Sequence, residues 1–328
     1  MGSGDRGGAC GACLVAGVSG PLITAPGCYP GISNEDYHRN PNLAWGPTIS
    51  SSGLKTLLNK SPLHYWFDSP LNPGRPAEAD KAHFNVGKAV HDMLLLSDRW
   101  PEHYYVTPED FNARKTKEQA DYHAALADAR ERGLCVLSFD QAETVKAMAA
   151  SLKNNPVASA ALTAGDPEMT LVWQDQLTGV LLRVRPDHLP FSVQTKRDIM
   201  AVVDVKTAVD ASHQAFSRAI NNFGYHMSAA LYADGIKAIF GHYPTHWLHV
   251  VIEKDPPYCV ALYELPGEDI ERGRALNRFA IDAYAKCIES GKWPGYADTP
   301  TQVGLPYWAR KQIDEGNAPE GVAWAQSA

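Results

Sequence analysis

The feature that most constrains the fold is a charged pair inside an apolar run, Asp204 and Lys206 in the segment AVVDVKT. Side chains alternate across a β-strand, so the two charged groups share one face and the valines share the other. A buried carboxylate and ammonium are costly to desolvate unless they pair or bind something. Asp187, at the end of the preceding apparent strand, would join them if the two strands pair as a hairpin. Leu181–Thr207 therefore has the pattern of a divalent-metal site with a lysine beside it. A solvated ion pair on an edge strand is the alternative.

The chain of 328 residues can form one large domain or a domain with extensions. Its composition, with 45% hydrophobic and 20% charged residues, is that of an ordinary globular protein. Residues 1–28 are rich in Gly, Ala and Cys, so we expect a flexible leader there. We expect residues 29–328 to form a single domain with N-terminal and C-terminal helical embellishments. No segment reaches transmembrane length, and a cytoplasmic protein without membrane contact is expected.

Charge and cysteine usage narrow the function classes. The formal net charge of −7 argues mildly against a protein that coats nucleic acid. It does not exclude a nuclease, in which an acidic metal site and a basic groove coexist with an acidic outer surface. Of six cysteines, only Cys10 and Cys13 form a Cys-x-x-Cys, without a second pair to complete a zinc or iron–sulfur site. We therefore expect no iron–sulfur cluster and a reducing compartment.

Local signals predict helices on both sides of the charged segment. Hydroxyls at Ser50 to Ser52 predict an N-cap for a following helix, and Gly291 predicts the end of a long one. Helices are predicted at residues 53–58, 84–96, 225–237 and 268–290. Strands are predicted at 169–174, 180–187 and 200–207 as a three-strand meander, and at 246–253 and 258–264 as a further pair. The expected fold class is α/β, a central mixed sheet flanked by helices.

These motifs together resemble the RecE-type exonucleases (exonuclease VIII-like), which are phage and prophage recombination nucleases of the PD-(D/E)xK superfamily. The resemblance extends from residue 29 to residue 265 and keeps four motifs in order. They are Ile49–Lys55, Gly87–His91, Arg185–Asp187 with Asp204–Thr207, and Phe223–Tyr232. The resemblance implies the restriction-endonuclease-like core of that superfamily.

The resemblance also assigns roles to the charged segment. It implies that Asp187 and Asp204 hold Mg²⁺, or Mn²⁺ in its place, with His91 and the backbone carbonyl of Val205 completing the protein ligands. Lys206 would position the attacking water and stabilise the pentacovalent phosphorus. Without the resemblance, His91 on an apolar helix face is more typical of a buried core residue.

Tyr225, Ser228 and Tyr232 share one face of their helix. The family usually carries Gln-x-x-x-Tyr here, whose polar groups brace the lysine and the water, so Tyr232 is predicted to be catalytic. Ser228 stands where the amide is expected, and Tyr225, His226 or a water would cover that loss. Aromatic core packing is the alternative for the tyrosines. Glu168 is expected beside the metal ligands or at a second metal, or else as a solvated carboxylate.

Five further residues are candidates for DNA contact. Ser51 and Ser52 with Lys55 could bind a phosphate at a helix N-terminus, with plain N-capping as the alternative. Arg183 and Arg185 alternate with apolar residues toward Asp187, so they are expected to guide the phosphate backbone or to pair with acids of the site.

The resemblance implies an Mg²⁺-dependent exonuclease that digests linear double-stranded DNA 5′→3′ and leaves 3′ single-stranded overhangs for phage-type homologous recombination. It further implies a ring-like homo-oligomer, a trimer or tetramer, and a RecT-type single-strand annealing partner. Two alternatives stay open: a Cas4-like or RecB-like single-strand nuclease, and a catalytically decayed DNA-binding scaffold. The missing cysteine trio argues against many nucleases of the first kind. The intact Asp187, Asp204 and Lys206 argue against decay, whereas Ser228 favours it.

Overall fold

The computed structural model describes residues 22–76, 86–95, 100–109, 116–163, 165–195, 200–297 and 299–315. Most of the predicted leader, with Cys10 and Cys13, lies outside these residues, as do residues 84, 85 and 96 of a predicted helix. The chain divides into two compact units, Met1–Trp293 and Pro294–Ala328, and each is described by itself. The second contributes helix α13 (Tyr307–Asp314). All other elements below belong to the first.

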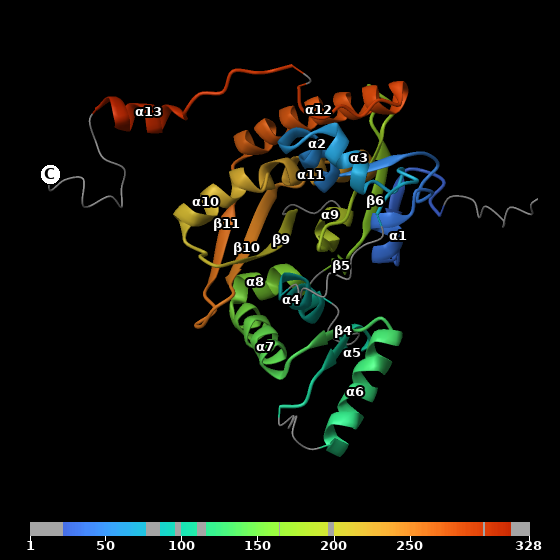
Figure 1. Ribbon diagram of the computed structural model, residues 1–328, viewed down its shortest axis with the longest axis vertical. Helices are drawn as coiled ribbons and strands as arrows, with labels where there is room; N and C mark the ends of the chain where they lie inside the picture. The colour runs from blue at the N-terminus through green and yellow to red at the C-terminus, as the bar shows by residue number, and fades with distance from the viewer. Residues whose placement is uncertain are drawn as a thin grey trace, which may run out of the picture. The chain divides into compact units, whose positions relative to one another are not determined.

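Two mixed sheets form the centre of the first unit (Figure 1). One sheet has the order β1-β6-β7-β2, in which only β2 and β7 run parallel. The other has the order β11-β10-β9-β8-β5, in which only β9 and β10 run parallel. The bounds are β1 (Gly27–Tyr29), β2 (Thr48–Ser50), β5 (Gly165–Pro167), β6 (Thr170–Gln174), β7 (Leu181–Val184), β8 (His188–Pro190), β9 (Ala201–Ala208), β10 (His246–Glu253) and β11 (Val260–Glu264). A small parallel pair, β3 (Tyr104–Val106) and β4 (Cys135–Leu137), stands apart.

Helices flank the sheets. In Figure 1, α11 and α12 lie on one side of β9 and β10, and α4, α7 and α8 lie on the other. The bounds are α1 (Asn34–Arg39), α2 (Ser51–Asn59), α3 (Pro62–Asp68), α4 (Val86–Leu95), α5 (Trp100–His103), α6 (Thr116–Glu131), α7 (Phe139–Asn154), α8 (Pro156–Thr163), α9 (Phe191–Thr195), α10 (His213–Asn222), α11 (Tyr225–Phe240) and α12 (Gly267–Ser290). The predicted α/β class with mixed sheets between helices is confirmed. Of the helices in the described ranges, none combines the length and apolarity needed to cross a bilayer.

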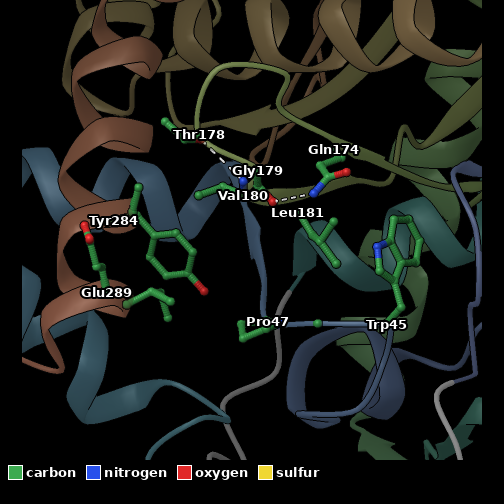
Figure 2. A pocket seen from close by; sticks show the side chains of 12 residues that line it. Trp45, Pro47, Gln174, Thr178, Gly179, Val180, Leu181, Tyr284 and Glu289 are labelled. Atoms are coloured by element: carbon green, nitrogen blue, oxygen red, sulfur yellow. Dashed lines mark hydrogen bonds between the residues drawn. The ribbon is translucent and has the colours of Figure 1, made fainter.

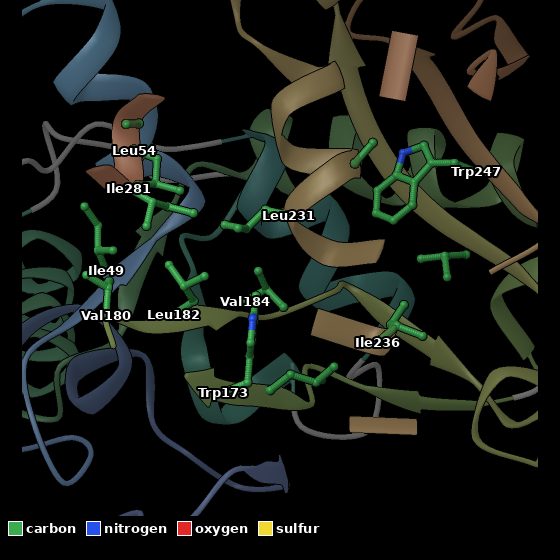
Figure 3. Close-up of a cluster of buried hydrophobic side chains, with 14 of the residues drawn as sticks. Ile49, Leu54, Trp173, Val180, Leu182, Val184, Leu231, Ile236, Trp247 and Ile281 are labelled. Carbon is green, nitrogen blue, oxygen red and sulfur yellow. The ribbon is translucent and has the colours of Figure 1, made fainter. Parts of the chain in front are cut away.

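Strand β9 separates two apolar clusters. Val203 and Val205 are buried against α4, α7 and α8 in one cluster. Val202 is buried in the other, which joins the β6–β7 sheet to α11 and α12. Figure 3 shows Leu182 and Val184 of β7 directed toward Leu231 of α11 in this second cluster. The predicted alternation of β9 is confirmed, and it places Asp204 and Lys206 on the α11 side.

The predicted three-strand meander is wrong at one step. Strand β9 does not pair with β7; it pairs with β8, through His188 opposite Val203. The chain leaves the first sheet after Val184 and enters the second at His188. Pro186 lies between them and has no backbone N–H, so it cannot continue a ladder. The hairpin expected between Asp187 and Asp204 therefore forms through β8.

A close helix contact fixes the start of α11. A Cβ at Gly273 of α12 would lie 2.2 Å from the backbone oxygen of His226, so only glycine fits. One turn further along α12, Asn277 donates from Nδ2 to the backbone oxygen of Met227 at 2.8 Å. Helix α11 begins directly after Gly224, whose φ of 62° is left-handed. The contacts with Gly273 and Asn277 then fix the first turn of α11 against α12. This turn carries Tyr225 and Ser228.

Candidate active site

A cleft of about 1270 Å³ opens where α1, α4, β9 and the start of α11 meet. Its wall carries the cationic side chains Arg39, Arg75, Lys88 and Lys206, together with the carboxylate of Glu35. Asp92 and Glu168 line it as well, next to His91. A polyanion could enter this cleft and meet a carboxylate centre at its inner wall.

Asp187 and His91 meet at the backbone of β9. The Oδ2 atom of Asp187 accepts a hydrogen bond from the backbone N–H of Val205 at 3.1 Å and lies 3.4 Å from Nδ1 of His91. The Nε2 atom of His91 lies 3.0 Å from the backbone oxygen of Val205, which can only accept, so Nε2 donates. Burial lowers the pKa of His91, but the Asp187 carboxylate outweighs this and raises it. Three of the four predicted metal ligands are thus in contact.

Asp204 and Lys206 form a short ion pair. Nζ of Lys206 lies 2.6 Å from Oδ2 of Asp204 and 3.3 Å from the backbone oxygen of Val205. Burial opposes the charge on both groups. The pKa of Asp204 is nevertheless held below its usual range by Lys206 and His249, and the pKa of Lys206 is raised by Asp204 and Asp187. Both groups are therefore charged at neutral pH.

The sequence reasoning missed His249. It lies on β10 directly opposite Asp204 in the parallel β9–β10 register. Its Nδ1 atom is 3.1 Å from Oδ2 of Asp204. The signal was available: two predicted strands separated by a helical stretch favour parallel pairing through a crossover, which would have set β10 beside β9.

Tyr225 is the aromatic residue beside Lys206. Nζ of Lys206 lies 5.3 Å from its ring centroid, and Tyr225 lines the cleft. Tyr232, the tyrosine predicted to be catalytic, packs edge-on against Trp247 with ring centroids 5.8 Å apart. Burial is the first cause of its strongly raised pKa, followed by the nearby Tyr37 and the charges of Asp187 and Asp204.

Ser228 has partners from α2. Nζ of Lys55 and the hydroxyl of Ser51 both donate to Oγ of Ser228, each at 3.0 Å. The stem of Lys55 passes over Gly224, where an added Cβ would lie 2.9 Å from its Cδ. Burial first, and then the charge of Lys206, lower the pKa of Lys55 to about 8. An ammonium therefore lies where an amide was expected.

Two of the predicted DNA contacts are corrected outright. The guanidinium of Arg183 is buried and donates to the backbone oxygen and hydroxyl of Thr48. That of Arg185 donates to Thr170 at 3.0 Å, Asn34 at 3.0 Å and the backbone oxygen of Ile32 at 2.9 Å. Both stack on the ring of Tyr37. Because both guanidinium groups are buried and bonded to neighbouring segments, these arginines tie the end of β7 to the N-terminal part of the chain and do not face a ligand.

The serines of α2 divide between capping and contact with α11. Ser50 caps the helix, as predicted for this stretch, since its Oγ accepts from the backbone N–H of Gly53 at 3.4 Å. Ser51 is buried against Ser228, so its hydroxyl is not available to a phosphate. Ser52 is exposed and pairs with Oγ of Ser50 at 2.9 Å.

Glu168 stands beside Asp187 in the cleft wall. Its backbone N–H donates to the backbone oxygen of Asp187 at 3.1 Å, and its φ of 49° is left-handed. Burial raises the pKa of Glu168, the nearby Arg185 opposes this, and Asp92 and Asp187 add to the rise. The carboxylate of Glu168 therefore lies near Asp187 but takes no part in the contacts between Asp187 and His91.

The donor set fits a divalent cation by its chemistry. Carboxylate oxygens of Asp187 and Asp204, the carbonyl of Val205 and an imidazole nitrogen of His91 suit Mg²⁺ or Mn²⁺. Within the described residues, no group of three or more His, Cys, Asp or Glu side chains is gathered as a metal site. The carboxylate of Asp204 is bound by Lys206 and His249 instead. The ligand set remains a prediction.

A second cavity, of about 580 Å³, lies between the β6–β7 turn and the end of α12 (Figure 2). Its walls are mainly apolar or neutral, with Glu289 as the one lining carboxylate. Within the β6–β7 turn, Gln174 donates from Nε2 to the backbone oxygen of Gly179 at 3.0 Å. Glu289 is the single carboxylic acid among the residues that line this cavity, whereas the cleft holds Lys206, Glu168 and His91 together.

Mixed sheets between helices, with Asp187, Asp204 and Lys206 brought together at the central strand β9, define a protein of the PD-(D/E)xK class. Residues 50–302 match the family described as a PDDEXK-like domain of unknown function (DUF3799), and the chain belongs to this family. A crystal structure described as a “Putative exonuclease” from Eubacterium rectale is similar at 11% sequence identity and a TM-score of 0.49, over 80% of this chain and 92% of that chain. No curated protein sequence is significantly similar to the chain.

Proposed function

We propose that this protein is a metal-dependent exodeoxyribonuclease that hydrolyses phosphodiester bonds of linear double-stranded DNA. The observation that carries the proposal is the meeting of Asp187, Asp204 and Lys206 at strand β9, where Val205 and Lys206 line a cleft that carries further cationic side chains. Carboxylates in such a place suit a cation and not the DNA itself, whereas the cationic lining suits the phosphate backbone. The family membership supports a nuclease fold for the same site.

Each residue has a role in this proposal. Asp187, Asp204, His91 and the carbonyl of Val205 would hold Mg²⁺, with Mn²⁺ as a substitute. When bound, the cation supplies an activated water and neutralises charge that develops on the phosphate. Lys206 orients that water and donates to a non-bridging oxygen, because its ammonium is charged and already lies at the ligands. Tyr225 limits the positions that Lys206 can take, since its ring lies beside Nζ.

The finer proposal is a RecE-type enzyme. It would digest one strand 5′→3′ and leave 3′ overhangs for phage-type recombination in the bacterial cytoplasm. It would act as a ring-like trimer or tetramer with a RecT-type annealing partner. The order of the four sequence motifs supports this, and a ring would confine the positive potential to its channel despite a net charge of −7.

The test is digestion of linear duplex and single-stranded DNA, labelled at the 5′ or the 3′ end, with Mg²⁺ or with EDTA. Wild type should release nucleotides from duplex ends only with Mg²⁺, and Asp204→Asn should release none. The absence of Mg²⁺-dependent release from every substrate would overturn the enzyme and leave a DNA-binding scaffold. Preference for single-stranded DNA would contradict the RecE-type hypothesis and favour a Cas4-like or RecB-like single-strand nuclease.

A further inference from the structure

His249 is a buried imidazole at the candidate centre. Its side chain is 1% exposed. Three aromatic rings enclose it, with centroids 5.3 Å away for Phe216, 5.7 Å for Tyr225 and 6.4 Å for Trp247. Its backbone is fixed as well, because it lies within the parallel ladder opposite Asp204. Packing therefore leaves the ring little room to move.

The hydrogen bond to Asp204 fixes the tautomer. An ionised carboxylate only accepts, so the proton of this contact is on Nδ1 of His249. Nε2 is buried with no hydrogen-bond partner in the described part of the chain, so the bond to Asp204 is the polar contact of this ring. His249 is thus a rigid donor aimed at one carboxylate oxygen.

Two donors converge on that oxygen. Nζ of Lys206 lies 2.6 Å and Nδ1 of His249 lies 3.1 Å from Oδ2 of Asp204. The two donors differ in mobility: the lysine has a flexible stem and also contacts the backbone oxygen of Val205, whereas the imidazole is packed on its faces. Among the described residues, no hydrogen bond or ion pair to Oδ1 of Asp204 is present alongside these contacts.

We propose that His249 is a positioning residue that holds Oδ2 of Asp204, so that Oδ1 stays available to a cation while Lys206 moves to the phosphate. The proposal rests on the function proposed above. A lysine that serves substrate must leave Asp204 for part of the cycle, and the carboxylate would then be free to rotate. The bond from His249 keeps one rotamer through that step. Hydrogen bonds of this kind to a ligand change metal affinity by about 10- to 100-fold.

The experiment measures Mn²⁺ binding to the full chain without DNA, by the electron paramagnetic resonance signal of free Mn²⁺. Three variants separate the hydrogen bond from the space that the ring fills. His249→Asn keeps a donor near the position of Nδ1, His249→Phe keeps a flat ring without a donor, and His249→Gln moves the amide beyond that position. Far-ultraviolet circular dichroism checks that each is folded, and digestion of duplex DNA with Mn²⁺ is measured in parallel.

We expect His249→Phe and His249→Gln to bind Mn²⁺ about 10- to 100-fold more weakly than wild type, and His249→Asn to recover most of that loss. If His249→Phe does not fold, the comparison of His249→Gln with His249→Asn decides. Equal Mn²⁺ affinity in wild type, His249→Gln and a folded His249→Phe would overturn the inference while the nuclease proposal stands. Mn²⁺ binding by His249→Asn that is as weak as that of His249→Gln would also overturn the inference and leave the nuclease proposal standing. A wild type that neither binds Mn²⁺ nor digests DNA would overturn both.

Discussion

Lys206 contacts two of the four groups predicted as cation ligands, the carboxylate of Asp204 through Oδ2 and the carbonyl of Val205. Its ammonium therefore competes with a divalent cation for the same charge. We expect Lys206→Met to abolish digestion and yet to bind Mn²⁺ roughly fivefold more tightly or better, because a like charge at this range opposes the cation by at least about 1 kcal/mol. Titration with Mn²⁺ measures this.

The matched control is Lys146→Met, which removes an exposed lysine of α7 that pairs with Glu143. It should leave both affinity and digestion unchanged. Weaker Mn²⁺ binding by Lys206→Met would mean that the lysine supports the ligand geometry and does not compete with the cation.

Lys55 is a lysine whose burial costs stability. Its pKa falls from 10.5 to about 8 in the folded chain, first because it is buried and then because Lys206 is near. Between these pH values the unfolded chain binds more protons, so the stability of wild type rises with pH. We expect Lys55→Met to be more stable than wild type below pH 8, with an advantage that shrinks toward pH 10.5. Urea unfolding across this range measures the difference.

Lys60→Met is the control, because Lys60 follows the same helix but is exposed. Its unfolding free energy should follow that of wild type at every pH. A Lys55→Met variant that is less stable than wild type at neutral pH would show that the bond to Ser228 outweighs the burial of the charge. A destabilising cation retained beside Lys206 is typical of a site selected for function.

At the scale of elements, the contact of α11 with α12 depends on one glycine. We expect Gly273→Ala to destabilise the protein by at least about 2 kcal/mol, because the new methyl would overpack against the backbone of His226. Alanine has a higher helix propensity than glycine, so propensity alone predicts that Gly273→Ala stabilises the protein. Gly267→Ala at the start of the same helix has open space and should be neutral or stabilising. Thermal unfolding of both variants checks this, and equal effects would exclude overpacking.

Elements defined by local chemistry could be predicted from the sequence. Ser50 caps α2 and Gly291 ends α12 because each acts within one helical turn. The alternation of β9 was equally readable, since it depends only on the pleat of one strand. Asp204 and Lys206 could therefore be placed together from spacing alone.

What failed depended on partners distant in the sequence. Arg183 bonds to Thr48, 135 residues away, so its position on a strand near Asp187 did not reveal its burial. Ser228 and Lys55 are 173 residues apart, so the sequence around Ser228 did not show that the ammonium of Lys55 lies beside it. His249 required the order of strands in a sheet, which no single segment encodes.

At the scale of the whole molecule, the cleft carries cationic side chains although the chain is acidic overall. The net charge is −7, while Arg39, Arg75 and Lys88 line the cleft. We expect Arg75→Ala and Lys88→Ala each to weaken DNA binding evenly across sequences and to reduce the slope of log affinity against log salt by about one. Fluorescence anisotropy in EDTA, over a series of salt concentrations, measures the slope. Lys146→Ala should leave it unchanged, and an equal loss in that variant would indicate that net charge and not the cleft governs binding.

The three-residue link Arg185–Asp187 has a consequence for how such a chain can vary. Asp187 belongs to neither sheet, yet its carboxylate meets Val205 only because β8 enters the second sheet in one register. Substitutions elsewhere in β7 or β8 do not change the number of residues between the two strands. The insertion or loss of one residue in the link would turn the carboxylate to the other side of the chain while both sheets remain folded. The residues Arg185 and Pro186 of this link can therefore be substituted more readily than the length of the link can change, because a change in length would remove the carboxylate of Asp187 from the site.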